Sequence, residues 1–171
     1  MGTIKYTAPE IGDILISAKD GCITGLYFHG NGDTSQNAHT PQSQVLLEKI
    51  HEQSTPEDVA VLQSVSKELD AYFAGSLREF SVPLKPEGTD FRKKVWTALQ
   101  TIPYGETISY KTLAQRINNP KAIRAVGGAN HHNPISIIIP CHRVIGANGK
   151  LVGYGGGMDV KRFLLALERG M

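Results

Sequence analysis

Cysteine is scarce in this chain of 171 residues, which contains only Cys22 and Cys141. Two cysteines exclude a disulfide framework and every zinc site that needs several thiolates. No apolar run approaches the roughly 18–20 residues of a membrane span, and no secretion signal is apparent. We therefore expect a cytoplasmic protein, or a nuclear one in a eukaryote, with no membrane partner. Each cysteine then needs its own explanation.

Charge is distributed unevenly along the chain. Residues 1–90 hold 6 basic against 13 acidic side chains, a net of −7, whereas residues 91–171 hold 12 against 3, a net of +9. A basic half suits a polyanion such as nucleic acid. Two oppositely charged domains that attract each other would produce the same pattern, so charge alone leaves both interpretations open.

The first half has the pattern of a small α/β unit. Two β-branched runs, 12–18 and 22–28, flank a Lys-Asp-Gly turn, which predicts a β-hairpin. Helices are predicted after Thr40 and after Thr55, because each is followed by proline at the first helical position. All of these features are explained by core packing.

A proline- and glycine-rich stretch, residues 81–88, predicts a linker between two domains. We place an α/β domain at 1–85 and a mostly helical domain at 86–171. Thr89 is expected to cap a helix that ends before Pro103. The fold class predicted for the whole chain is therefore mixed α+β.

Two further short helices follow in the second domain. One is predicted over residues 109–117, and the next is expected to have Asn119 as its cap and Pro120 at its first position. Two short helices joined by a tight polar turn are typical of a helix-turn-helix. Ordinary helical hairpins share this pattern.

The second of these helices is rich in small residues, although each glycine costs up to about 1 kcal/mol relative to alanine inside a helix. Its exposed surface would suit close approach of a sugar-phosphate backbone, with Arg124 protruding from it. Close packing against another helix explains the composition equally well. The small residues are Ala122, Ala125, Gly127, Gly128 and Ala129.

Cys141 follows an apolar run, 135–139, which predicts a short buried strand. Because His142 and Arg143 come next, we expect a thiol with a lowered pKa that acts as a nucleophile. The alternative is an inert cysteine that serves only as a small core residue. Neighbouring side chains of an extended chain point to opposite sides, so His142 needs a water or a turn to reach the thiol. Glu168, on the edge of the last helix's apolar stripe, is a candidate partner for His142, unless it is a surface acid.

Several motifs together resemble the O6-alkylguanine-DNA alkyltransferase family, also called methylated-DNA--protein-cysteine S-methyltransferases. The resemblance covers residues 69–171 well and the first 60 only in outline. It implies a ribonuclease H-like first domain, followed by a helical domain in which a short strand leads to the acceptor cysteine. The motifs are YFAG (72–75), IPYGET (102–107), RAVGGAN (124–130), IPCHRV (139–144) and LLALE (164–168).

The resemblance implies a reaction in which Cys141 takes the alkyl group from O6 of guanine, or O4 of thymine, once per molecule. His142, oriented by Glu168, would remove the thiol proton through a water. Tyr110 would donate to the leaving base. Arg124 would fill the gap left by the extruded nucleotide, because a stacked base cannot reach a buried thiol.

The resemblance also implies how the base is held. Asn133 would brace the turn before the acceptor, and the small-residue helix would enter the minor groove. The carbonyls of Cys141 and Val144 would read the guanine edge together with the loop residues Tyr154, Gly155 and Gly156, of which Gly155 replaces a serine found in some members. Glycines there could equally form a plain flexible loop.

The implied partner is double-stranded DNA containing O6-alkylguanine. No cofactor and no small-molecule methyl donor are expected, because the damaged DNA supplies the alkyl group. Some relatives hold zinc in the first domain, but Cys22 and His29 are too few ligands, so no metal is expected. We expect a monomer, and cooperative binding along DNA is left open.

Two other functions compete with this interpretation. A protein that only recognises alkylated bases would lack the acceptor, whereas this chain retains Cys141. A cysteine hydrolase would use Cys141, His142 and Asn133, but it would need the histidine across the site from the thiol. It would also leave the basic half unexplained.

Overall fold

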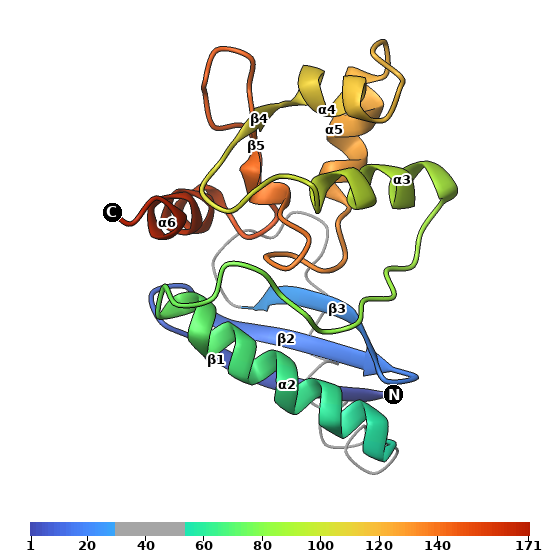
Figure 1. Ribbon diagram of the computed structural model, residues 1–171, viewed down its shortest axis with the longest axis vertical. Coiled ribbons are helices and arrows are strands. Elements are labelled where there is room, and N and C mark those ends of the chain that lie inside the picture. The colour runs from blue at the N-terminus through green and yellow to red at the C-terminus, as the bar shows by residue number, and fades with distance from the viewer. Residues whose placement is uncertain (30–53) are drawn as a thin grey trace. The chain divides into compact units, whose positions relative to one another are not determined.

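The computed structural model describes residues 1–29 and 54–171 (Figure 1). These residues form two compact units, Met1–Pro86 and Glu87–Met171. The helix predicted after Thr40 lies outside the described residues. Within the described ranges, no helix combines the length and the apolar character needed to cross a bilayer.

In the described residues of the first unit, an antiparallel sheet has one helix packed against it (Figure 1). Helix α2 (Pro56–Phe73) contacts all three strands, and Thr55 caps it by accepting from the Asp58 N–H. The predicted helix after Thr55 is thus confirmed. The strands, in sheet order, are β1 (Gly2–Ala8), β2 (Gly12–Lys19) and β3 (Cys22–His29).

The predicted hairpin is confirmed as β2 and β3. Its two turn residues, Asp20 and Gly21, have φ of 55° and 70°, the left-handed region that two-residue hairpin turns require. The first strand, β1, was not predicted from the sequence. Its residues are mostly half-exposed, with only the two ends buried, so the hydrophobic alternation that marks a strand is weak there.

The second unit is mostly helical (Figure 1). Helix α5 (Ile123–His131) packs against both α3 (Asp90–Leu99) and α4 (Tyr110–Arg116). The Trp96 Nε1–H donates to the Ala129 carbonyl at 2.8 Å, which fastens α5 to α3. Strands β4 (Ile108–Ser109) and β5 (Val144–Ile145) pair in parallel. The elements are α3 (Asp90–Leu99), β4 (Ile108–Ser109), α4 (Tyr110–Arg116), α5 (Ile123–His131), the 3₁₀ turn η2 (Cys141–Arg143), β5 (Val144–Ile145) and α6 (Met158–Glu168).

The predicted cap of α3 at Thr89 and the pair of short helices α4 and α5 are confirmed. The predicted start of the second helix at Pro120 is wrong, because α5 begins at Ile123 with Ala122 at its N-cap. The Ala122 N–H donates to the Asn119 carbonyl at 3.0 Å. This bond closes a separate turn and delays the helix.

Candidate active site

The apolar run before Cys141 is buried but is not a strand, so that prediction is wrong. Ile137 has φ of +71°, and the Ile139 N–H donates to the Ile135 carbonyl at 3.0 Å, which folds the run into turns. The Asn133 side chain accepts from the Ile135 N–H at 3.0 Å and donates to the Ile139 carbonyl at 2.7 Å. Asn133 therefore supplies hydrogen bonds that a neighbouring strand would otherwise provide.

Cys141 and His142 lie on the 3₁₀ turn η2, not on extended chain. Cys141 is 4% exposed, and this burial raises the pKa of its thiol above the usual range. Asn133 and the charge of Lys161 oppose that rise without overcoming it. The expected lowering of the pKa by His142 and Arg143 is thus not found, and the thiol needs a base to become a thiolate.

His142 is paired with Glu168 of α6, with Nε2 2.7 Å from Oε1 and both side chains fully buried. Burial lowers the pKa of His142 below its usual value, which favours the neutral imidazole at pH 7. A neutral ring that donates Nε2–H to the carboxylate has Nδ1 free to accept a proton. Nδ1 is buried and has no hydrogen-bond partner among the described residues.

Glu168 also binds Arg143, at 2.9 Å from the guanidinium Nε to Oε2. Burial alone would raise the pKa of Glu168, but the hydrogen bonds and charges of His142 and Arg143 hold it well below its usual range. The sequence analysis treated Arg143 only as a cation beside the thiol. Its partner lies 25 residues away in the chain, which is why local reasoning missed the contact.

Lys161 of α6 is a second residue that the sequence analysis missed. It is fully buried, and its Nζ donates to the carbonyls of Val144 at 2.7 Å and Val152 at 3.1 Å. Burial lowers the pKa of the ammonium, and the nearby Cys141 opposes this. The available signal was its spacing, since Lys161 precedes Leu164 and Leu165 by three and four residues and so shares their buried face.

Tyr110, the first residue of α4, faces the same region. Its hydroxyl donates to the Val152 carbonyl at 3.3 Å, and burial raises the pKa of the phenol. Asn130, at the end of α5, donates to the Cys141 carbonyl at 3.4 Å. The Asn130 bond thus connects α5 to the turn that carries Cys141.

The glycine loop before α6 contains a turn in which the Gly157 N–H donates to the Tyr154 carbonyl at 2.9 Å. Gly156 is buried and Gly155 is exposed. A Cβ added at Gly155 would meet nothing within 4 Å. The exposed Gly155 backbone is therefore accessible to a ligand.

The small-residue face of α5 is only partly as expected. Arg124, Ala125 and Gly128 are exposed, and a Cβ added at Gly128 would meet nothing within 4 Å. A Cβ at Gly127 would only touch the Tyr110 ring at 3.9 Å. Ala122 is half-buried. Ala129 is 3% exposed, so its side chain packs inward and the expectation that it lies on the binding face is wrong.

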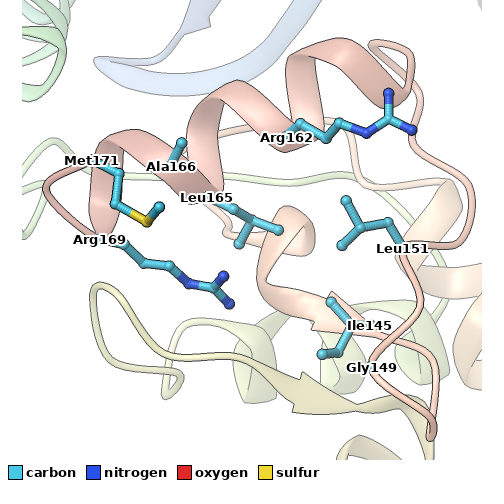
Figure 2. Close-up of a pocket in the computed structure, with 8 residues that line it drawn as sticks. All are labelled: Ile145, Gly149, Leu151, Arg162, Leu165, Ala166, Arg169 and Met171. Atoms are coloured by element: carbon cyan, nitrogen blue, oxygen red, sulfur yellow. The ribbon is translucent and has the colours of Figure 1, made fainter.

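A separate groove lies between α6 and the β5 region, with an apolar floor and arginines at its edge (Figure 2). Neither Cys141 nor any other predicted site residue lines it. Its lining residues are Ile145, Gly149, Leu151, Arg162, Leu165, Ala166, Arg169 and Met171.

Comparison with known proteins gives two matching family models. Residues 4–86 match the ribonuclease-like domain of 6-O-methylguanine DNA methyltransferase, and residues 90–170 match its DNA-binding domain. The chain is 52% identical over 154 residues to a methylated-DNA--protein-cysteine methyltransferase of Mycobacterium tuberculosis, covering 88% of this chain and 89% of the relative. A relative of that name from Methanosarcina acetivorans is 61% identical over 112 residues, 66% of this chain and 72% of its own length.

Solved structures agree with these matches. The crystal structure of the M. tuberculosis O6-methylguanine methyltransferase superposes with a TM-score of 0.80 at 44% identity, covering 99% of this chain and 93% of the other. The M. tuberculosis protein in complex with DNA gives a TM-score of 0.76 at 46% identity, covering 98% and 91%. The mixed α+β fold predicted from the sequence is confirmed by these neighbours.

Proposed function

The chain belongs to the methylated-DNA--protein-cysteine methyltransferase family, and we propose that Cys141 is the cysteine that receives the alkyl group. As a member of that family it binds DNA and repairs it by direct reversal. One observation carries the choice of Cys141: it precedes, on one buried turn, His142, whose Nε2 is paired with Glu168 and whose buried Nδ1 has no hydrogen-bond partner among the described residues. The other cysteine, Cys22, lies on β3 of the first unit.

The transfer is a displacement at the alkyl carbon. The Cys141 sulfur forms a bond to that carbon while the bond from carbon to O6 breaks, and its electron pair stays on the guanine. The thiol proton passes to His142 Nδ1 through a water, and a proton is returned to the leaving base. The Tyr110 hydroxyl donates a hydrogen bond to the base. A thioether is a poor leaving group, so each molecule reacts once. No cofactor is needed, because the damaged DNA supplies the alkyl group.

The second domain, 86–171, carries both DNA binding and transfer. The exposed small residues of α5, Ala125 and Gly128 among them, lie against the minor groove, and binding is mostly to phosphates. Because Cys141 is buried, the damaged nucleotide is rotated out of the stack, and Arg124 occupies its place.

The base is recognised at its edge. The carbonyls of Cys141 and Val144 accept from guanine, and the exposed N–H of Gly155 donates to it, with Tyr154 and Gly156 shaping the loop. O6-alkylguanine is the principal substrate, and O4-alkylthymine is a second one. We further propose that the protein acts in the cytoplasm and that it is a monomer. Size-exclusion chromatography with and without DNA tests the oligomeric state.

Intact mass spectrometry after mixing with a short duplex containing O6-methylguanine tests the reaction. We expect a gain of one methyl group per molecule, mapped to Cys141, and no gain for Cys141→Ser, which still binds the duplex. A duplex that is bound but leaves the mass unchanged would indicate a damage-recognition protein. Catalytic turnover of an ester or amide would indicate a hydrolase.

A further inference from the structure

Arg143 binds the same carboxylate as His142, and the transfer reaction above gives it no role. We propose that Arg143 is a positioning residue that holds His142 uncharged and ready to accept a proton, by fixing and neutralising Glu168. This inference rests on the proposed function of Cys141 and His142.

The geometry fixes the carboxylate in one orientation. The guanidinium donates from Nε to Oε2 and from Nη2 to Oε1, both at 2.9 Å, while Nη1 donates to the Ile102 carbonyl at 2.6 Å. The Gly105 N–H lies 3.4 Å from Oε2. Oε1 is therefore presented to His142 Nε2, and rotation of the carboxylate would break several bonds at once.

Burial is the first cause that favours a neutral imidazole at His142, and the positive charge of Arg143 acts in the same direction. An isolated carboxylate 2.7 Å from Nε2 would favour the imidazolium form strongly in a buried site. The positive charge of Arg143 opposes that effect, and with His142 neutral the three-residue cluster has no net formal charge. Burial lowers the pKa of His142 first, and the positive charge of Arg143 lowers it further, against the opposing effect of Glu168.

The other groups around His142 act in the same direction as Arg143 or are uncharged. Helix α6 contributes the Lys161 ammonium, which also lowers the pKa of His142, and the turn itself contributes the Cys141 thiol. Helix α3 packs against this turn, and the residues that it buries are Val95, Trp96 and Leu99. Within the described residues, Glu168 is therefore the anion that Arg143 must balance.

The test is a set of variants at these two positions. In Arg143→Gln, Glu168 keeps its charge without the guanidinium beside it, so the pKa of His142 rises. In a plot of transfer rate against pH, the fall in rate toward low pH should therefore begin at a higher pH. At pH 7 transfer should be roughly 100-fold slower, the lower end of the range that a lost general base produces. In Arg143→Gln with Glu168→Gln, the anion is removed as well, and the pKa of His142 falls below that of Arg143→Gln.

Two measurements are needed. NMR titration of the His142 ring, assigned with His142→Gln, reports its pKa without any substrate. Single-turnover transfer from a saturating O6-methylguanine duplex, measured at several pH values, reports the rate. Arg162→Gln is the matched control, since Arg162 lies on α6 in an exposed ion pair with Asp159 and should change neither quantity.

The outcomes separate this inference from the proposed function. An unchanged pKa of His142 in Arg143→Gln, with the rate reduced equally at every pH, would overturn it and assign Arg143 a purely structural role. Absence of transfer in the unaltered protein would instead reject the proposed function, while the ring titration would still report on Arg143.

If Arg143→Gln does not fold, Arg143→Lys provides the test. Lysine keeps the positive charge but cannot reproduce the planar fork of N–H donors. The pKa of His142 should then stay low while transfer falls about tenfold, within the range that misplacing a catalytic group produces. Transfer equal to that of the unaltered protein would contradict the proposal.

Discussion

The two units of this protein bury different kinds of side chain. Among the described residues, Asp58 is the one buried charged or polar residue of the first unit. The second unit buries six, which are Asn130, Asn133, His142, Arg143, Lys161 and Glu168. Buried charges cost free energy unless each one is paired. Their concentration around Cys141 therefore supports the second unit as the one that we propose carries out the transfer.

Asp58 shows what a structural buried acid does. It accepts from the Gly21 N–H at 2.9 Å and lies 3.3 Å from the amino group of Met1, so it ties the hairpin turn and the chain start to α2. Its pKa is lowered, first by the bond from Gly21. Glu168 also has a lowered pKa, but its partners are His142 and Arg143, the base and the cation of the proposed site.

The largest expected effect comes from removing the acid of the second unit. Glu168→Ala leaves His142 and Arg143 buried without their partner, and breaking such a pair costs about 3–5 kcal/mol. Urea unfolding should show this loss in the free energy of unfolding, and methyl transfer should fall below detection at the same time. A loss below about 1 kcal/mol, the scale of an exposed ion pair, would contradict the comparison.

A smaller effect is expected from the acid of the first unit. Asp58→Ala leaves the Gly21 N–H without its acceptor, which costs about 1–3 kcal/mol of unfolding free energy. The single-turnover transfer rate per folded molecule should be unchanged. If that rate fell as far as in Glu168→Ala, the division between a structural and a chemical buried acid would be wrong.

The smallest effect concerns an uncharged surface. Gly128→Ala should raise the free energy of unfolding by about 0.5–1 kcal/mol, because alanine favours a helix and a Cβ has room there. The affinity for duplex DNA, measured by fluorescence anisotropy, should nevertheless fall, since the methyl group protrudes from the face assigned to the minor groove. Unchanged affinity would exclude this part of α5 from the DNA contact.

Local signals predicted much of the fold. The caps Thr55 and Thr89 and the Asp-Gly turn act within a few residues, so the sequence contains their whole cause. The strand predicted over 135–139 failed for the opposite reason. Its apolar run correctly indicated burial, but whether a buried run extends or turns depends here on the side chain of Asn133.

The candidate site was predictable where it follows motifs and unpredictable where it depends on distant partners. Cys141 and His142 are adjacent in the sequence, and the helical spacing of Glu168 suggested that it faces inward. The bond from Arg143 to Glu168 and the burial of Lys161 need α6 to be packed against η2. Spacing along one element cannot supply that tertiary contact.

The twin hydrogen bonds of Asn133 give the segment up to Cys141 a fixed length. One inserted residue would add up to about 3.3–3.6 Å of chain, comparable with the whole separation between reacting atoms in a productive complex. The segment between the end of α5 and Cys141 therefore sets a fixed distance between the helix that we assign to DNA binding and the thiol.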